Sequence, residues 1–154
     1  MPELNQPAPD FKSVNQNEEE ITLSQFRGKQ NVVLYFYPRD DTPGCTTEAM
    51  EFTALIKEFD KADTVVLGVS RDTVVKHQKF INKRELKVDL IADESGEVCE
   101  AYGVWQLKKF MGREFMGIVR STFVIDKKGL LVEQVLKVKA KGHAQQMLDL
   151  VKTL

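Results

Sequence analysis

Cys45 is the residue of this sequence whose type and local setting best suit covalent chemistry. It follows Thr42, Pro43 and Gly44, a combination typical of a helix N-terminus. Thr42 is a favourable N-cap, and Pro43 suits the first helical position because its missing N–H would have no partner there. A helical side chain leans toward the N-terminus, so the sulfur is expected to face unpaired N–H groups and the positive end of the helix dipole. Both features favour the nucleophilic thiolate, which makes Cys45 a candidate nucleophile.

A packing role for Cys45 is the alternative interpretation. The apolar residues Ala49, Phe52, Ile56 and Phe59 continue at spacings of three and four, so they share one helical face with Cys45. Free cysteine often serves as a small buried hydrophobe on such a face. The placement of Thr, Pro and Gly fits stabilisation of a thiolate better than simple core filling, and it favours the functional role.

The remaining candidate ligands and thiols give weaker signals. Two cysteines, Cys45 and Cys99, are too few for a disulfide framework, and no Cys-x-x-Cys pair offers dithiol chemistry. His77 and His143 lie far apart, with no cysteine or carboxylate at ligand spacing. We therefore expect both histidines to be exposed helix residues and predict neither a metal site nor a bound cofactor.

Alternating strand and helix patterns provide the scaffold that must position Cys45. A weak hairpin is predicted at 11–14 and 20–23, and strands at 31–37, 64–69, 90–92, 122–125 and 130–136. Helices are predicted at 45–59, 74–83, 95–102 and 144–154. Early parallel crossovers and a late hairpin indicate an α/β fold with a mixed central sheet and helices on both faces, and a thioredoxin-like arrangement meets that description.

Length and composition exclude several classes of protein. A chain of 154 residues without repeats or linkers predicts one domain over 1–154. A net charge of −1 argues against a nucleic-acid partner. The longest apolar run, 32–37, is far shorter than the roughly 20 residues of a membrane-spanning helix. The N-terminus lacks the features of a secretory signal, so the expected location is the cytoplasm.

Motifs along nearly the whole chain resemble those of the peroxiredoxins, in particular the bacterioferritin-comigratory subgroup. The first is Phe36-Tyr37-Pro38-x-x-x-Thr42-Pro43-Gly44-Cys45-Thr46. The others follow in the family's order: Gly68-Val69-Ser70-x-Asp72, Asp93-Glu94, Val98-Cys99-Glu100-x-Tyr102-Gly103-Val104-Trp105, Lys109-x-Met111-Gly112 and Arg120-Ser121-Thr122-Phe123-x-Ile125-Asp126. The resemblance implies a thiol peroxidase that reduces hydrogen peroxide and organic hydroperoxides without metal, haem or flavin.

The resemblance also implies a role for each matching site residue. Cys45 matches the peroxidatic cysteine, whose thiolate attacks a peroxide and becomes a sulfenic acid. Thr42, the backbone N–H groups of Gly44 and Cys45, and Arg120 match the donors that stabilise the leaving oxygen. Pro38 matches a proline that shields the pocket from water. Without the resemblance, Arg120 would be interpreted as a solvated charge at the start of a strand.

The second thiol needed for turnover is missing from its usual position. Many members of the subgroup carry a resolving cysteine five residues after the peroxidatic one, where this chain has Met50. Cys99 is the only other candidate, and a small buried hydrophobe is the preferred interpretation of it. We therefore predict a one-cysteine route, in which thioredoxin, glutaredoxin or glutathione reduces Cys45 directly. The subgroup resemblance suggests a monomer, and the rival functions are a redox sensor or relay and a glutathione-dependent transferase.

Overall fold

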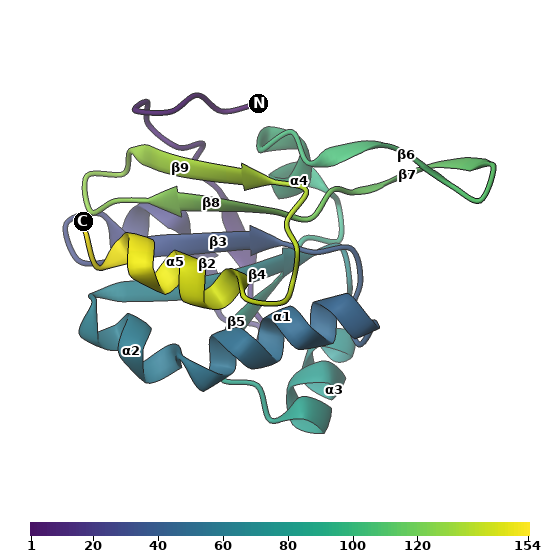
Figure 1. The fold of residues 1–154 in the computed structure, drawn as a ribbon, viewed down its shortest axis with the longest axis horizontal. Coiled ribbons are helices and arrows are strands. Elements are labelled where there is room, and N and C mark those ends of the chain that lie inside the picture. Colours follow the sequence, from purple (N-terminus) through teal and green to yellow (C-terminus); the bar gives the residue numbers. More distant parts are fainter.

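A five-stranded mixed sheet organises the computed structural model, which describes residues 1–154 (Figure 1). The strand order is β5-β4-β3-β8-β9, with β3, β4 and β5 parallel and with β8 and β9 antiparallel to their neighbours. The strands are β3 (Asn31–Phe36), β4 (Thr64–Ser70), β5 (Asp89–Ala92), β8 (Ser121–Ile125) and β9 (Leu131–Leu136). A separate antiparallel hairpin joins β1 (Lys12–Val14) and β2 (Glu20–Thr22). The predicted α/β class with a mixed sheet is confirmed.

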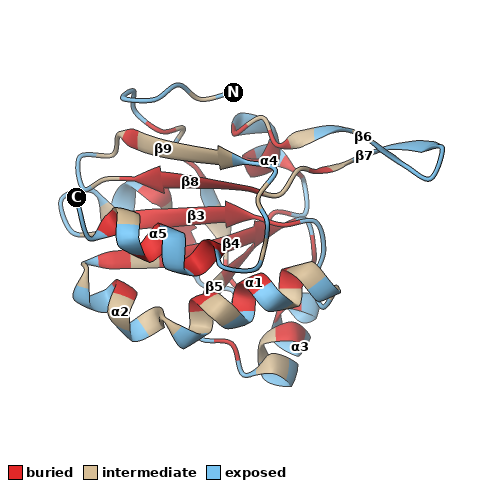
Figure 2. Cartoon of the chain, in the orientation of Figure 1, coloured by how far each residue is buried: buried red, intermediate tan, exposed pale blue.

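Two hydrophobic clusters cover the two faces of the sheet, as the burial pattern shows (Figure 2). Strand β3 serves both, because successive side chains of a strand point to opposite faces. Val32, Leu34 and Phe36 face the N-terminal segment, and Val33 and Tyr35 face the main helical layer. That layer consists of α1 (Pro43–Ala54), α2 (Ile56–Lys61), α3 (Val74–Arg84) and α5 (His143–Val151). The short helices η1 (Leu23–Phe26) and α4 (Glu97–Ala101) belong to the other face.

The single helix predicted over 45–59 is two helices in the structure. Leu55 ends α1 and precedes α2, and its φ of −102° and ψ of 7° depart from helical geometry. Phe52 and Phe59 are nevertheless both buried, because the two helices follow the same sheet face. The apolar spacing therefore located the buried face but not the break. None of the helices combines the length and the apolar character that crossing a membrane requires.

The hairpin of β6 (Trp105–Phe110) and β7 (Arg113–Ile118) was not predicted from the sequence. It projects from the body of the protein, where it forms its own two-stranded sheet (Figure 1). Apolar side chains along it remain exposed, Met111 at the turn most of all at 87%. Apolar and polar residues do not alternate regularly along 105–110 and 113–118, because no covering layer requires one apolar face, so the periodicity on which strand prediction depends is weak. The chain leaves this hairpin just before Arg120, which begins the approach to β8.

Candidate active site

Cys45 lies in the first turn of α1, at the end of a loop that begins where β3 ends. Thr42 is the N-cap residue and Pro43 the first helical residue, as predicted. The Thr42 hydroxyl does not cap the helix but donates to the carbonyl oxygen of Arg39 at 2.9 Å. The N–H groups of Gly44 and Cys45 therefore lack a side-chain acceptor and also lack intrahelical partners. They provide two free donors beside the sulfur of a residue that is only 1% exposed.

Arg120 joins the thiol to a buried carboxylate on the same helix. Its Nη2 group donates to Sγ of Cys45 at 3.3 Å, and its Nη1 group donates to Oε1 of Glu48 at 2.8 Å. Glu48 is fully buried, and the side chain of Arg120 is 17% exposed. The guanidinium fork can make both contacts at once because its donors lie in one plane. A positive charge is thereby held against the sulfur, where it stabilises negative charge.

Burial is the largest single influence on the pKa values of Glu48, Arg120 and Tyr35. Desolvation raises the pKa of Glu48 from 4.5 to about 7, despite the opposing charge of Arg120. For Arg120, burial lowers the pKa, but the negative charges of Glu48 and Cys45 outweigh it and the net shift is upward. Burial and then Glu48 raise the pKa of the neighbouring Tyr35, so its phenol stays neutral. Near neutral pH the cluster therefore combines a permanent cation with a carboxyl group that changes charge.

Gly44 is needed because the Arg120 side chain approaches its backbone closely, and not because its backbone angles are unusual. A Cβ atom added at this position would lie 3.0 Å from Nη2 of Arg120. That distance is shorter than a normal van der Waals contact, so a side chain here would push the guanidinium away from the sulfur. Pro38, at the other end of the loop, is exposed. The structure thus brings Thr42, Gly44 and Arg120 together around Cys45, with Pro38 at the rim.

Cys99 belongs to the cluster on the opposite face of the sheet from Cys45. It is fully buried in α4, and burial followed by the neighbouring Asp93 strongly raises the pKa of its thiol. The backbone N–H of Cys99 donates to the Asp93 carboxylate at 2.9 Å. The residue five positions after Cys45, Met50, is 47% exposed and carries no thiol. Neither position places a second thiol near Sγ of Cys45.

Both histidines are buried, so the prediction that they are exposed helix residues is wrong. His77 is fully buried, and its ring nitrogens contact the Asp40 carboxylate and the Ile91 carbonyl oxygen. His143 is 2% exposed and contacts the Thr122 hydroxyl at 2.7 Å. Burial and then the charge of Arg120 lower the pKa of His143 to about 4, so its ring is neutral near pH 7. Polar partners distant in the sequence allow both rings to be buried.

Three potential metal ligands that are separated in the sequence come close together in the structure. Ligand atoms of Asp40, Asp72 and His77 lie within 4.8 Å of one another. Both nitrogens of the His77 ring already have hydrogen-bond partners within the protein, and Asp72 accepts from Ser70 and from the backbone of Asp40. The ring nitrogens of His77 are therefore engaged within the protein, whereas the carboxylate oxygens keep further lone pairs. The group is better described as a hydrogen-bond network than as a metal centre.

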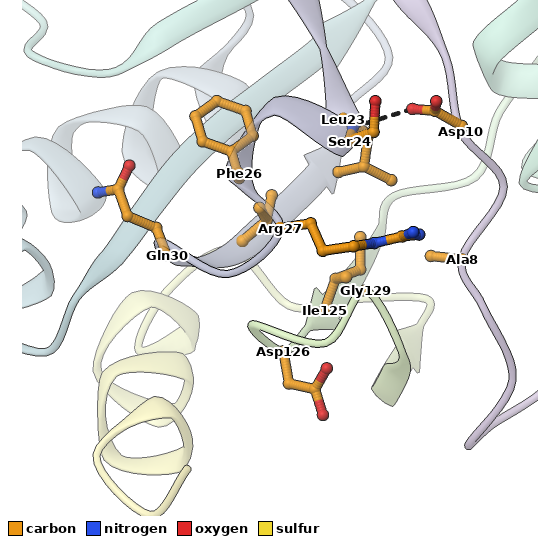
Figure 3. Close-up of a pocket in the computed structure, with 11 residues that line it drawn as sticks. Ala8, Asp10, Leu23, Ser24, Phe26, Arg27, Gln30, Ile125, Asp126 and Gly129 are labelled. Carbon is orange, nitrogen blue, oxygen red and sulfur yellow. Dashed lines mark hydrogen bonds between the residues drawn. The ribbon is translucent and has the colours of Figure 1, made fainter.

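A cavity at the opposite end of β3 is separate from this site (Figure 3). It holds about 20 Å³, close to the space of a single water molecule. Arg27 extends across it toward Gly129, and Asp10 accepts a hydrogen bond from the backbone of Ser24. Neither cysteine lines the cavity. Its size and lining therefore do not suit a substrate site.

Glu48 is the main site residue that sequence analysis missed. The sequence does indicate that Glu48 lies on the buried face of the helix, because it follows Cys45 by three residues and precedes Phe52 by four. A carboxylate in such a position indicates a buried partner, because an unpaired buried charge is costly. The partner, Arg120, lies 72 residues away, and no local pattern identifies it.

Comparison with known proteins gives consistent matches over nearly the full chain. A protein-family model described as the AhpC/TSA family matches residues 4–134. Peroxiredoxin Bcp of Bacillus subtilis is 45% identical over 152 residues, which cover 99% of this chain and 96% of that protein. A putative peroxiredoxin bcp of Helicobacter pylori strain J99 is 48% identical and is matched over 96% of both chains.

Solved structures agree with these matches. A structure of the Xanthomonas campestris bacterioferritin comigratory protein, from work on its alkyl peroxide reduction activity, superposes with a TM-score of 0.88 and 39% identity. The match covers 93% of this chain and 90% of that chain. A PrxQ mutant from Xylella fastidiosa superposes with a TM-score of 0.90 and 33% identity, over 99% and 98% of the two chains. The predicted thioredoxin-like α/β fold is thus confirmed.

Proposed function

Because the chain belongs to the AhpC/TSA family and is a peroxiredoxin, we propose that Cys45 is its peroxidatic residue and reduces hydrogen peroxide and organic hydroperoxides. The thiolate attacks one peroxide oxygen, the O–O bond breaks, and the sulfur gains that oxygen as a sulfenic acid. The other oxygen takes up a proton and leaves as water or an alcohol. The observation that carries the proposal is the 3.3 Å contact between Arg120 Nη2 and Cys45 Sγ at a helix N-terminus.

The surrounding groups suit the charge that develops during this step. Negative charge moves from the sulfur to the leaving oxygen, so donors must surround both atoms. Arg120 and the N–H groups of Gly44 and Cys45 are such donors, held in place before the reaction. The resemblance implies that Thr42 is a donor, but its hydroxyl hydrogen is already donated to the carbonyl oxygen of Arg39. In this geometry the Thr42 oxygen would instead accept a hydrogen bond from the O–H group of the peroxide. Pro38 would limit access of water from the rim of the loop.

We propose a one-cysteine route for reduction of the sulfenic acid. Three observations support it: Met50 stands at the usual resolving position, Cys99 lies in the cluster beyond the sheet, and burial and Asp93 raise the pKa of the Cys99 thiol. A disulfide needs Cα atoms within about 7 Å, which two opposite sheet faces do not offer. An external thiol such as thioredoxin, glutaredoxin or glutathione would therefore attack Cys45 directly.

Intact-protein mass spectrometry after one equivalent of hydrogen peroxide tests the chemistry. We expect the wild type to gain one oxygen, trapped at Cys45 by a sulfenic-acid reagent, and Cys45→Ser to gain none. Cys99→Ser is the matched control and should behave as the wild type. A loss of two hydrogens that maps to Cys45 and Cys99 would contradict the one-cysteine route but retain the peroxidase. No reaction at Cys45 would contradict the peroxidase itself.

A redox sensor or relay is the second candidate, because the protein lacks a resolving thiol near Cys45. Such a protein would pass a mixed disulfide from Cys45 to a partner protein instead of turning over. Continuous consumption of peroxide with any of the three thiol reductants would support the enzyme. A single stoichiometric oxidation with every reductant would support the sensor.

We also propose that residues 1–154 form one domain that acts as a monomer. Full-length matches to relatives and a single central sheet support the domain assignment. Light scattering coupled to size-exclusion chromatography tests the second part, with an expected mass near 17.6 kDa. A mass twice as large would contradict the monomer.

A further inference from the structure

Asp40 anchors the active-site loop to buried groups on three neighbouring elements. Its Oδ2 atom lies 2.7 Å from Nδ1 of His77 on α3, and its Oδ1 atom accepts from the Tyr37 hydroxyl at 2.6 Å. Its backbone N–H donates to Asp72 at 2.8 Å, just after β4. The side chains of His77 and Asp40 are 0% and 7% exposed. The loop that carries Thr42 is therefore held from behind by a buried network, separate from the groups that touch Cys45.

The hydrogen-bond partners of His77 fix the number of protons in this network. Nε2 of His77 lies 2.9 Å from the carbonyl oxygen of Ile91, which can only accept, so Nε2 must carry a proton. A neutral ring would then present a lone pair from Nδ1 to the Asp40 carboxylate, and two acceptors at 2.7 Å repel each other. One additional proton must lie between Nδ1 and Oδ2.

Tyr37 indicates which of the two groups holds that proton. Burial and then the charge of Asp40 raise the pKa of Tyr37 well above 10, so its hydroxyl stays protonated and donates to Asp40. Asp40 therefore acts as an acceptor through both carboxyl oxygens, toward Tyr37 and toward His77. The arrangement is a buried imidazolium–carboxylate pair, in which both ring N–H groups of His77 donate.

We propose that His77, as an imidazolium, is a positioning residue for the peroxidase reaction, which it serves by holding Asp40 and thereby the loop that sets Thr42 and the first turn of α1. The inference rests on the proposed function, since it concerns the geometry at Cys45. His77 does not touch the reacting atoms. Loss of the contact between Nδ1 of His77 and Oδ2 of Asp40 would release Asp40 and loosen the loop.

Other contacts between the loop and α3 do not replace this pair. Asp41 contacts Lys83 at 2.6 Å and Arg84 at 3.1 Å, but these three side chains are between 34% and 59% exposed. Exposed pairs of this kind contribute little and are screened by salt. The charged groups around the His77–Asp40 pair are Arg39, Asp41, Asp72, Lys76, Lys79 and Lys83, which line the adjoining surface pocket with Asp40.

Two substitutions separate positioning from simple packing. His77→Asn keeps an amide N–H where Nδ1–H stood, whereas His77→Ala removes the donor. Ile81→Val is the matched control, because Ile81 packs from the same helix against the core of the helical layer and does not line the pocket that contains Asp40. The measured quantity is the rate constant for oxidation of Cys45 by hydrogen peroxide, followed across the pH range by quenching and mass spectrometry.

We expect His77→Asn to keep most of the wild-type rate, because its amide N–H can still donate to the Asp40 carboxylate. His77→Ala should lower the rate by about 10- to 100-fold, the scale of a misplaced reacting geometry. Ile81→Val should keep the wild-type rate. Equal rates for His77→Asn and His77→Ala would overturn the proposal.

Nitrogen NMR of the ring gives a readout that does not depend on activity. The chain has only two histidines, and His143→Gln identifies the signals of the other one. Both His77 nitrogens should have shifts of protonated nitrogen near pH 7. A neutral His77 ring would also overturn the proposal. Absence of any reaction between the wild type and peroxide would instead refute the proposed function, and the nitrogen spectra would still decide the state of His77.

Discussion

Replacement of Glu48 by Gln should remove a pH dependence from the stability of the protein. Burial raises the pKa of Glu48 from its ordinary value of 4.5 to about 7 in the folded chain. That shift corresponds to about 3 kcal/mol of free energy, as an order of magnitude. Below pH 4.5 the carboxyl group is protonated in both the folded and the unfolded states, and its titration contributes nothing.

Between pH 4.5 and about 7 the folded state keeps a proton that the unfolded state has lost. The free energy of unfolding therefore falls as the pH rises through this window, and above it the full cost of about 3 kcal/mol is present. Glu48→Gln has no such proton to lose. The difference in unfolding free energy, variant minus wild type, should accordingly grow by about 3 kcal/mol from the acid to the alkaline end of the window.

Urea denaturation of the reduced proteins at a series of pH values measures this difference. Glu100→Gln is a suitable control, because Glu100 is exposed on α4, and its difference from wild type should stay constant. The slope of free energy against urea should be the same for all three proteins, so that only the midpoint reports stability. A Glu48→Gln difference that is equal at both ends of the window would show that burial does not perturb this carboxyl group, and the reasoning would fail.

Three further predictions concern the groups around Arg120. Gly44→Ala should slow oxidation of Cys45 by about tenfold in stopped-flow measurements, because its Cβ would lie 3.0 Å from Nη2 and displace the guanidinium; an unchanged rate would show that Arg120 adapts freely. Arg120→Lys should slow the same reaction by a similar or larger factor, since one ammonium cannot reproduce the planar fork toward both Cys45 and Glu48, and wild-type kinetics would contradict the role of the fork. His143, whose pKa is lowered from 6.5 to about 4, should contribute stability above pH 6.5 that is lost as the pH falls toward 4. Urea titrations of His143→Gln should lack this loss, and an equal loss in both proteins would refute the assignment.

The sequence located the residues that act through local structure. Thr42, Pro43 and Gly44 specify a helix start within four residues, so the environment of Cys45 at the first turn could be predicted before any fold was known. Arg120 could be assigned only through the motif that contains it, because it approaches the sulfur from 75 residues away.

Burial of charged and titratable groups was beyond prediction for a different reason. His77 and Glu48 lie on helices that the sequence predicts, yet their partners Asp40 and Arg120 come from two loops that only the folded chain brings near. The cost of burying such groups depends on those partners and not on helical spacing. The β6–β7 hairpin escaped prediction because no covering layer imposes a regular alternation on it.

The same hairpin bears on how the protein behaves in concentrated solution. Each of its strands has one edge without a partner, and Phe110 and Phe115 are exposed on it. Unpaired strand edges recruit strands from other molecules and initiate aggregation, unless charges interrupt them. Lys109 and Glu114 stand opposite each other across the hairpin, and Arg113 lies at its turn. These charged side chains keep the exposed apolar hairpin from acting as a template for intermolecular sheets. Their replacement by neutral residues would therefore increase aggregation without altering Cys45.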